Sequence, residues 1–315
     1  MAVSTVSKVV NGYPNVSEET REKVNGAVRE LNFTPNTIAS ALSSKRAGRV
    51  ALLINQSTQS VDEVAMQYLS GAINRAQEEK LDVITVFFSM IRDRGVEDIT
   101  RYFQAQSIEG LLIYGMGRDD GVLHELIGEQ QFKVVAVDAP FVNENTSCVG
   151  IDHAQAQYDV AKKTLRENRG KAVLYIAGKK DGYVTRERMA GMWRLVQEEG
   201  LSLTVHRGDF SEKKARELTF SHAKGADLIV CASDLMAIGA MRALQEMDIF
   251  RPVCGFDGIT LMGYAGKQMN TVKQDFRRVS AVAMEEMARL LEGGTGRRLT
   301  PNYELVRMQY LDIIN

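Results

Sequence analysis

Short apolar runs alternate with longer amphipathic stretches from residue 50 to residue 256 of this 315-residue chain. The runs have the length and composition of buried strands, and the stretches between them repeat their apolar residues at helical spacing. Alternation of this kind is typical of parallel sheets that are covered by helices. The strands are too many for one compact sheet, so the sequence predicts an α/β fold with two similar lobes.

The predicted elements follow from these runs. We expect strands at 50–54, 81–88, 110–114, 133–138, 171–177, 202–207, 227–232 and 253–256. We expect helices at 63–79, 98–106, 123–129, 154–167, 188–199, 212–223 and 235–247. Because open parallel sheets bind ligands beyond the carboxyl ends of their strands, a ligand site is predicted in the cleft between the two lobes.

The first 42 residues have a different pattern, which predicts a small helical unit. Residues 4–10 place Val6, Val9 and Val10 on one helical face. Short polar side chains occupy the other face, where they suit phosphates and base edges. Ser17 is the expected N-cap of a second helix, whose first turn carries acidic residues. The core-facing stripe predicted for that helix consists of Val24, Ala27, Val28 and Leu31.

Three motifs in this region resemble one known family. They are T-V-S-K-V-V-N at 5–11, V-S-E-E-T-R-E-K-V at 16–24 and, in a predicted Pro-initiated helix, P-N-x-x-A-x-x-L at 35–42. Their order and spacing are similar to those of the headpiece of lactose-repressor and galactose-repressor (LacI/GalR) type transcriptional regulators. In that family the first of these helices reads the major groove, and the last, the hinge helix, lies in the minor groove.

The resemblance implies eleven DNA-contacting residues. They are Val3, Ser4, Thr5, Ser7, Lys8, Asn11, Asn15, Thr20, Asn36, Ala39 and Leu42. Val3, Ser4 and Lys8 would read base edges, and Asn15 would lie close to a base. The other polar members would hold phosphates. Leu42 would be an apolar wedge that enters between base pairs and kinks the duplex.

The start of the chain departs from the family pattern. The family headpiece begins with another helix and a G-V-S turn, both upstream of what is here Met1. We therefore expect a partial helix-turn-helix, either because the chain is truncated or because its start is assigned late. The alternative hypothesis is a cytoplasmic small-molecule (sugar) binding protein without DNA-binding activity, because the headpiece is incomplete.

The resemblance continues over the rest of the chain. The matching pieces are I-D at 151–152, R-x-x-G at 188–191, G-D-F-S at 208–211, A-S-D-L-M-A-I-G-A at 232–240, G-F-D at 255–257 and T-V-K-Q-D-F at 271–276. They imply a two-lobed core like that of periplasmic binding proteins, with crossings near 149–151, 273–276 and 299–302. The implied domains are a headpiece at 1–34, a hinge helix and linker at 35–49, and an effector-binding and dimerisation domain at 50–315. Its first lobe covers about 50–150 and 274–300, and its second lobe about 151–273 and 301–315.

A candidate effector site follows from strand ends and from the resemblance. A polyhydroxyl ligand needs paired donors and acceptors and an apolar face for stacking. Arg188 can supply paired N–H donors, Asp152 and Asp257 can accept from hydroxyls, and Phe210 matches an aromatic stacking position of the family. The complete predicted set is Asp152, Arg188, Phe210, Ser233, Asp257 and Gln274.

Two departures bear on the ligand. Ser233 stands where the family commonly has Asn, so a direct contact is lost or mediated by water. Residues 55–63 are polar and lack the usual N-P-F-F, which normally contributes apolar contacts. The predicted effector is therefore a sugar or sugar phosphate rather than a nucleobase that needs aromatic stacking on that side.

The predicted mechanism is allosteric. Ligand in the cleft would change the angle between the lobes of a homodimer, and that change would order or disorder the two hinge helices. Two-fold symmetry predicts a near-palindromic double-stranded operator. The outer helices of the first lobe, including 68–76, are candidates for the dimer face. The chain shows no heptad tail, so a tetramer formed through such a tail is not expected.

Composition excludes several other classes. The net charge is −1, but residues 1–49 carry seven Lys or Arg against four Glu, which suits a basic DNA reader on an acidic regulatory body. No G-x-S-x-G, Walker-type loop or H-E-x-x-H is present. The three Cys and four His are dispersed, so neither enzymatic activity nor a metal or other cofactor is predicted. No signal pattern and no apolar run of about 18 residues is present, which predicts a cytoplasmic location without membrane contact.

Overall fold

A computed structural model describes residues 3–10, 15–30, 48–55 and 62–308, and the chain divides into two units, 1–47 and 48–315. The smaller unit has α1 (Val3–Val10) and α2 (Glu18–Glu30), which are two of the three helices predicted there. Val9 and Val24 are buried. The prediction that Ala27 belongs to the core is wrong, since its side chain is exposed. Within the described part of this unit, only α1 packs on α2, and it covers a stripe too narrow to include Ala27. The helix predicted at 35–42 lies outside the described residues.

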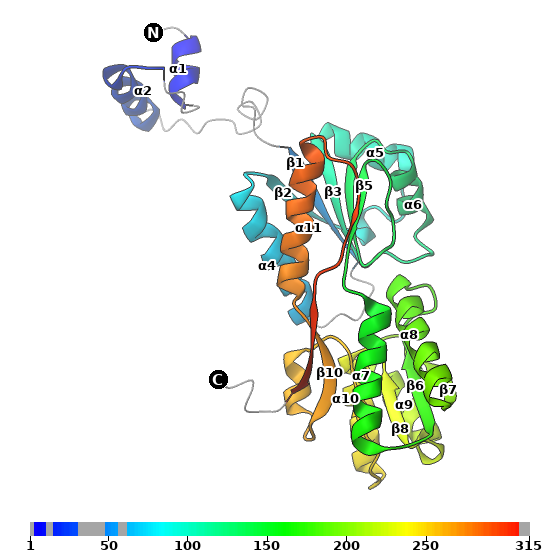
Figure 1. Cartoon of the computed structure of the whole chain (residues 1–315). Coiled ribbons are helices and arrows are strands. Elements are labelled where there is room, and N and C mark those ends of the chain that lie inside the picture. Colours follow the sequence, from blue (N-terminus) through cyan, green and yellow to red (C-terminus); the bar gives the residue numbers. More distant parts are fainter. Residues whose placement is uncertain (1–2, 11–14, 31–47, 56–61, 309–315) are drawn as a thin grey trace. The chain divides into compact units, whose positions relative to one another are not determined.

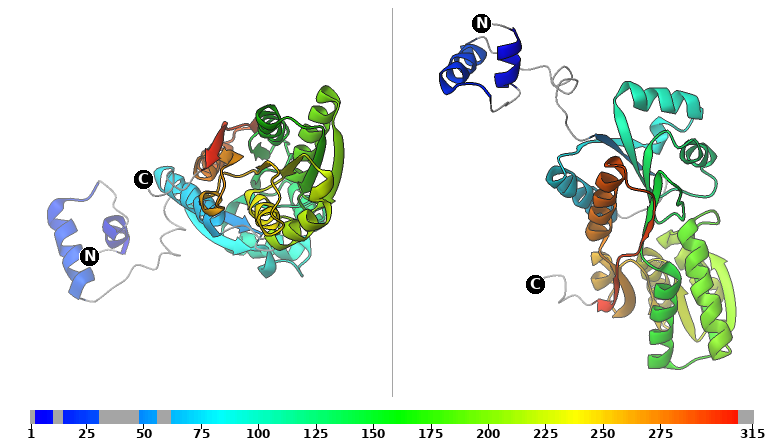
Figure 2. Two further views of the ribbon diagram at one scale, coloured as in Figure 1. Left: turned by 90° about the horizontal axis from the view of Figure 1, so that it is seen from below. Right: turned by 45° about the horizontal axis from the view of Figure 1, so that its top comes forward.

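The larger unit contains two six-stranded sheets, so the predicted fold class is confirmed. The first sheet has the order β11-β5-β4-β3-β1-β2, and the second has the order β12-β10-β9-β8-β6-β7. All neighbouring strands described in the first sheet are parallel. In the second sheet, the described pairs are parallel except for β12, which runs antiparallel to β10. Figures 1 and 2 show helices on both faces of each sheet.

The first sheet and its helices form one lobe. Its strands are β1 (Arg49–Ile54), β2 (Asp82–Phe87), β3 (Ile108–Tyr114), β4 (Lys133–Val137), β5 (Thr146–Val149) and β11 (Arg298–Leu299). Its helices are α4 (Asp62–Glu78), η1 (Phe88–Met90), α5 (Val96–Ala105), α6 (Gly121–Gly128) and α11 (Phe276–Leu291). The long helices α4 and α11 pack against each other, and α11 also packs on β3 and β4.

The second sheet and its helices form the other lobe. Its strands are β6 (Ala172–Ala177), β7 (Ser202–Arg207), β8 (Leu228–Cys231), β9 (Val253–Cys254), β10 (Met269–Gln274) and β12 (Tyr303–Met308). Its helices are α7 (His153–Asn168), α8 (Tyr183–Glu199), α9 (Glu212–His222), η2 (Ala223–Gly225), α10 (Asp234–Glu246) and η3 (Thr260–Tyr264). Helix α7 packs on α8, and α9 packs on α10.

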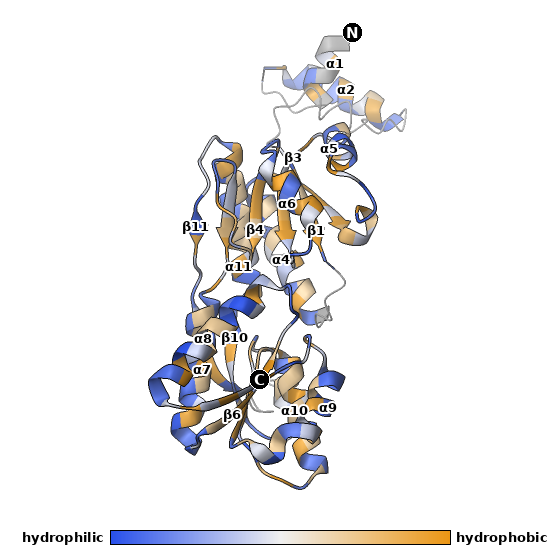
Figure 3. Cartoon of the chain, turned by 90° about the vertical axis from the view of Figure 1, so that its right-hand side faces the viewer, coloured by the Kyte–Doolittle hydropathy of each residue, from blue (hydrophilic) through white to orange (hydrophobic). Residues whose placement is uncertain are grey.

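Burial on both faces explains the continuous apolar run of β1 from Val50 to Leu53. In β1, Val50 and Leu52 belong to one hydrophobic cluster, while Ala51 and Leu53 belong to another on the opposite face. A strand covered by helices on both sides has no face left for polar residues. Figure 3 shows the resulting concentration of hydrophobic residues in the strands.

The chain passes between the two sheets three times: after β5 (150–152), after β10 (at Asp275) and after β11 (300–302). Because of these passes, α11 packs in the first lobe, although the strand that precedes it lies in the second. The carboxyl ends of β4, β9 and β10 therefore lie close to the crossings. No helix in the described part of the chain has both the length and the apolar character needed to span a membrane.

Candidate functional site

A cavity of about 640 Å³ lies between the two lobes of the larger unit. Its walls come from both lobes, including Tyr68 and Asp138 from the first and Arg188, Phe210 and Asp257 from the second. This volume is within the usual range for pockets that hold small organic ligands. Of the six residues predicted for the effector site, the cavity is lined by five: Arg188, Phe210, Ser233, Asp257 and Gln274.

Arg188 is a buried cation in the wall of the cavity. Its side chain is only 5% exposed. The guanidinium lies 3.6 Å above the centre of the Phe256 ring, donates to the Ala232 carbonyl oxygen and has Nη2 3.5 Å from Asp257 Oδ1. Cation–π contact and several acceptors together hold the guanidinium plane in one orientation.

Asp257 is the carboxylate opposite Arg188. It follows β9 in a left-handed backbone conformation, with φ of 123°, which an aspartate adopts only at a cost. Gln274 Nε2 donates to its Oδ1 over 3.0 Å. Burial raises the pKa of Asp257 to about 6, although Arg188 opposes that rise. The negative charge of Asp257 is therefore incompletely compensated, and a ligand that donates hydrogen bonds would stabilise it.

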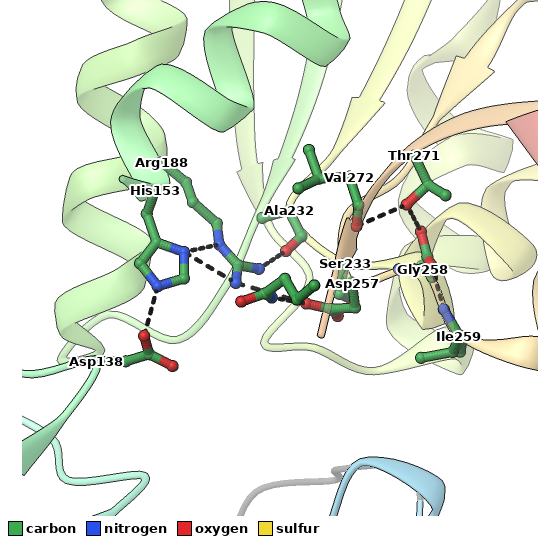
Figure 4. Close-up of polar contacts among 12 residues, drawn as sticks. Asp138, His153, Arg188, Ala232, Ser233, Asp257, Gly258, Ile259, Thr271 and Val272 are labelled. Atoms are coloured by element: carbon green, nitrogen blue, oxygen red, sulfur yellow. Dashed lines mark hydrogen bonds and ion pairs between the residues drawn. The ribbon is translucent and has the colours of Figure 1, made fainter. Parts of the chain in front are cut away.

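A buried polar cluster fixes the loop that carries Asp257. The Asp234 carboxylate is fully buried and accepts from the backbone N–H groups of Gly258 at 2.7 Å and Ile259 at 2.9 Å. Its other oxygen accepts from Thr271 Oγ1 at 2.5 Å. Since a buried carboxylate with several donors resists movement, Asp234 positions the backbone that follows Asp257. Figure 4 shows the donors Gly258, Ile259 and Thr271 together with the contacts of Arg188.

Ser233 and Phe210 line the cavity in different ways. Ser233 is the N-cap of α10, and its hydroxyl oxygen accepts from the backbone N–H of Met236 at 3.3 Å. Phe210 has a positive φ of 62° and packs closely on Gly178. A Cβ at Gly178 would lie 2.1 Å from the Phe210 ring, so only glycine permits this approach.

Asp152 corrects the predicted set, because it does not line the cavity. Its side chain is exposed and caps α7 by accepting from the Gln155 backbone N–H at 2.8 Å. A carboxylate engaged at an N-cap points along the helix end rather than into the cleft. Near this crossing the carboxylate that lines the cavity is that of Asp138 rather than that of Asp152.

Asp138 is a cavity-lining carboxylate outside the predicted set. It follows β4 with φ of 58° and lines the cavity. Tyr68 Oη donates to its Oδ2 over 3.2 Å, and His153 Nε2 is 2.9 Å from its Oδ1. Burial raises the pKa of Asp138, but the hydrogen bond from His153, the positive charge of Arg188 and the hydrogen bond from Tyr68 hold that pKa below its usual value. The signal for Asp138 was present, because it directly follows the apolar run at 133–137.

Contacts at the rim of the cavity join the two lobes directly. The Arg118 backbone N–H donates to the Asp181 carbonyl oxygen at 2.8 Å, beside a bridge between Gly117 and Gly182. On another part of the rim, Glu63 accepts from the Thr260 hydroxyl at 2.6 Å and from its backbone N–H at 3.1 Å. A change in the angle between the lobes would have to alter these contacts.

The candidate DNA-contacting residues are only partly described. In the smaller unit, Lys8 and Asn15 are exposed and Thr5 is half-buried. The Thr20 hydroxyl is 2.9 Å from that of Ser17, so the two hydroxyls already form a pair. The side chains of Val3, Ser4 and Ser7, and all of Asn11, Asn36, Ala39 and Leu42, lie outside the described residues.

Family models match both units of the chain. The family of bacterial regulatory proteins, lacI family, matches residues 2–36, and the periplasmic binding protein domain matches residues 121–295. Catabolite control protein A of Staphylococcus aureus (strain MRSA252) is 24% identical over 312 residues, which cover 92% of this chain and 89% of that protein. The HTH-type transcriptional repressor PurR of Aliivibrio salmonicida (strain LFI1238) is 25% identical over 299 residues, which cover 90% of this chain and 87% of that protein.

Two solved structures are similar over nearly the whole chain. A lac repressor dimer bound to operator and the anti-inducer ONPF has a TM-score of 0.82 and 25% identity, with 97% of this chain and 94% of that chain covered. A complex of the transcriptional regulator CelR with cellobiose has a TM-score of 0.74 and 25% identity, with 98% and 96% covered. The similarity extends across both units and the two-lobed core.

Proposed function

Because the chain belongs to the lacI family of bacterial regulatory proteins, we propose that this DNA-binding transcriptional regulator is a repressor controlled by a neutral sugar or similar polyol bound between its two lobes. The regulator would act as a homodimer on near-palindromic operator DNA. Its place of action would be the cytoplasm, where the operator is. Enzymatic activity is not part of this function, since the family consists of transcriptional regulators.

The observation that carries the effector proposal is a group of three charged side chains in the wall of the cavity. There the Arg188 guanidinium and the carboxylates of Asp138 and Asp257 converge from two lobes. Vicinal hydroxyls both donate and accept, so they suit a site with donors and acceptors side by side. Beside Arg188, two carboxylates against one guanidinium disfavour a phosphate. Across the whole cavity five Asp carboxylates face four Lys or Arg side chains, so the lining offers a phosphate no net positive charge, which supports a neutral sugar over a sugar phosphate.

We assign the effector contacts to Arg188, Phe210, Ser233, Asp257 and Gln274, as predicted, and add Asp138. The half-buried Phe210 ring would stack on the apolar face of a sugar. The cellobiose complex of CelR supports a carbohydrate in this kind of cleft, and the operator complex of the lac repressor supports duplex DNA as the second partner.

The predicted DNA contacts remain part of the proposal. Val3, Ser4 and Lys8 would read base edges from α1, and Leu42 would insert into the minor groove. Effector binding would shift the equilibrium between two lobe angles, because only one of them matches the ligand. That shift would order or disorder the hinge helices and so change operator affinity.

The test is operator binding followed by fluorescence anisotropy. The full chain is titrated into a pool of near-palindromic duplexes at two salt concentrations, with and without a panel of neutral mono- and disaccharides that includes cellobiose. We expect selective, salt-dependent binding that one sugar of the panel shifts by about tenfold or more. Absence of selective binding would overturn the repressor assignment, and a response to phosphorylated sugars alone would overturn the neutral-sugar assignment.

Two aspartates of the predicted set, one inside the cavity lining and one outside it, give a matched pair of variants. Asp257→Asn should weaken sugar binding about 10–100-fold and leave operator binding in place. Asp152→Asn should leave both unchanged, because Asn caps a helix as well as Asp and the side chain lies outside the cavity. An equal loss in both variants would contradict the assignment of Asp257.

A further inference from the structure

His153 has an unusual place beside the candidate effector site. It is the first residue of α7, and its side chain is 1% exposed. One ring nitrogen, Nε2, faces Asp138 Oδ1 at 2.9 Å. The other, Nδ1, is 3.4 Å from both Nε and Nη2 of Arg188. The imidazole is therefore enclosed between a carboxylate of the first lobe and a guanidinium of the second (Figure 4).

These two contacts require the same tautomer. A guanidinium has N–H donors and no acceptor, so Nδ1 must carry a lone pair toward Arg188. The ring proton then resides on Nε2, where it donates to Asp138. The opposite tautomer would set N–H against N–H on one side and a lone pair against a carboxylate on the other. An imidazolium would still oppose Arg188 with a donor, so the neutral Nε2–H form is the one that satisfies both neighbours.

The ring of Phe256 contacts both His153 and Arg188. Its ring stacks on that of His153, with ring centres 5.7 Å apart and an interplanar angle of 28°. The same ring lies 3.6 Å beneath the Arg188 guanidinium. Because Phe256 is fully buried, its ring holds both groups at a fixed distance from its face. The contact with His153 then fixes how the guanidinium is rotated within its own plane.

The orientation of the Arg188 guanidinium determines which of its N–H groups are available to a ligand. Its contacts with Ala232 and His153 use the N–H groups that point into the protein. Nη2 is 3.5 Å from Asp257 Oδ1, which is longer than an ordinary charge-assisted hydrogen bond. A ligand hydroxyl can therefore accept from Arg188 and donate to Asp257 only while the guanidinium keeps this orientation.

We propose that His153, as the neutral Nε2–H tautomer, is a positioning residue of the effector site that orients Arg188 and ties it to Asp138 of the first lobe. This inference rests on the proposed function, in which Arg188 contacts the effector. His153 would not itself touch the ligand, since it does not line the cavity. Its effect on affinity would arise through Arg188.

The tautomer can be measured without any effector. The chain has four histidines, so a long-range ¹H–¹⁵N correlation spectrum of the ¹⁵N-labelled full chain contains four imidazole patterns. The pattern of His153 is the one that disappears in His153→Gln, or, if that variant does not fold, the one that persists in single Gln variants of the other three. We expect protonated Nε2 and unprotonated Nδ1. A protonated Nδ1 would overturn the proposal.

A pair of variants separates positioning from packing. His153→Gln keeps an acceptor and an N–H donor on a flexible chain, whereas His153→Leu keeps only the volume. We expect the Nε–H resonance of Arg188 to persist in His153→Gln and to be lost in His153→Leu. Sugar affinity should fall about tenfold or more in His153→Leu and stay within about threefold in His153→Gln. His222→Gln, at the end of α9, serves as the control and should change neither.

The two proposals fail in different ways. If no sugar of the panel changes operator binding, the proposed function is contradicted, while the tautomer and the Arg188 resonance still decide the role of His153. If a sugar binds but both His153 variants lose affinity equally, His153 acts only through packing and the positioning role is overturned.

Discussion

Asp138 and Asp257 occupy equivalent places in the two lobes and differ in their electrostatics. Each follows the fourth strand from the same edge of its sheet, β4 in one lobe and β9 in the other. Each has a positive φ, and each carboxylate lines the cavity. Yet the pKa of Asp138 is lowered, whereas that of Asp257 is raised to about 6.

The difference lies in the donors around each group. Burial raises the pKa of both carboxylates, so burial alone cannot explain why their pKa values shift in opposite directions. Asp138 has His153 at 2.9 Å and Tyr68 at 3.2 Å, in addition to the field of Arg188. Asp257 has Gln274 at 3.0 Å and Arg188 at the longer distance of 3.5 Å. In the proposed site both carboxylates can contact the effector, but Asp138 is already stabilised by protein donors, whereas Asp257 gains more from a ligand.

Removal of the cation that both carboxylates share should have the largest effect. Arg188→Leu would leave Asp257 buried beside an apolar side chain, which should lower the free energy of unfolding by about 3–5 kcal/mol. It should also abolish the sugar response. Urea unfolding at pH 7.5 measures the first effect, and operator anisotropy measures the second. Arg186→Leu on the same helix is the control, since its side chain is exposed. Equal stability of the two variants would contradict a central role for Arg188.

Neutralising each carboxylate in turn should give effects of opposite sign on stability. Asp257→Asn removes a charge that the fold compensates poorly, so the free energy of unfolding should rise by about 1–3 kcal/mol at pH 7.5. Asp138→Asn removes a charge that the fold stabilises, so the free energy of unfolding should fall by about 1–3 kcal/mol. Sugar affinity should drop about 10–100-fold in Asp257→Asn despite the gain in stability. Two destabilised variants would show that the two lobes do not differ as inferred.

The same contrast predicts the pH dependence of stability. The folded pKa of Asp257 lies above its unfolded value, so the folded state binds the extra proton between about pH 4 and 6. Acidification from pH 7.5 to 5 should therefore stabilise the wild type by about 1 kcal/mol relative to Asp257→Asn. Asp138 has a lowered folded pKa, so the stability that it contributes should be lost only below about pH 4. The free energy of unfolding of the wild type and of both Asn variants, measured at each pH over this range, tests the direction predicted for each aspartate.

Much of the fold is predictable because buried strands and amphipathic helices leave strong local patterns. The eight predicted strands and seven predicted helices from residue 50 to residue 256 all correspond to observed elements, with shifts at their ends. Helix α8 begins at Tyr183, whereas the predicted helix begins at 188. The sequence gives no signal for the true start, because the N-cap residue Gly182 has no capping side chain. The four-residue β5 and the two-residue β11 are too short for periodicity to identify, and their strand pairing depends on distant residues.

The site is less predictable because its chemistry depends on contacts between distant segments. Arg188 and Asp257 follow from motifs, and Asp138 follows from the strand-end rule once that rule is applied to every strand. His153 could not be found in this way, since only its place between Asp138 and Arg188 gives it a role. Asp152 matches the family motif, yet its carboxylate does not line the cavity, because it caps the N-terminus of α7.

Ser233 and Ser211 offer the smallest and most selective comparison. Both are N-caps of helices in the second lobe, each accepting from a backbone N–H at 3.3 Å, yet only Ser233 lines the cavity. Ser→Ala at either position should lower the free energy of unfolding by about 1 kcal/mol through loss of the cap. Only Ser233→Ala should also weaken sugar binding, by about threefold to tenfold, because a neutral hydroxyl contact contributes about 1 kcal/mol. Thermal unfolding and sugar titration of both variants measure the two effects. Unchanged sugar affinity in Ser233→Ala would mean that its hydroxyl serves α10 alone, and that the polar contacts to the effector come from Arg188, Asp257 and their immediate neighbours.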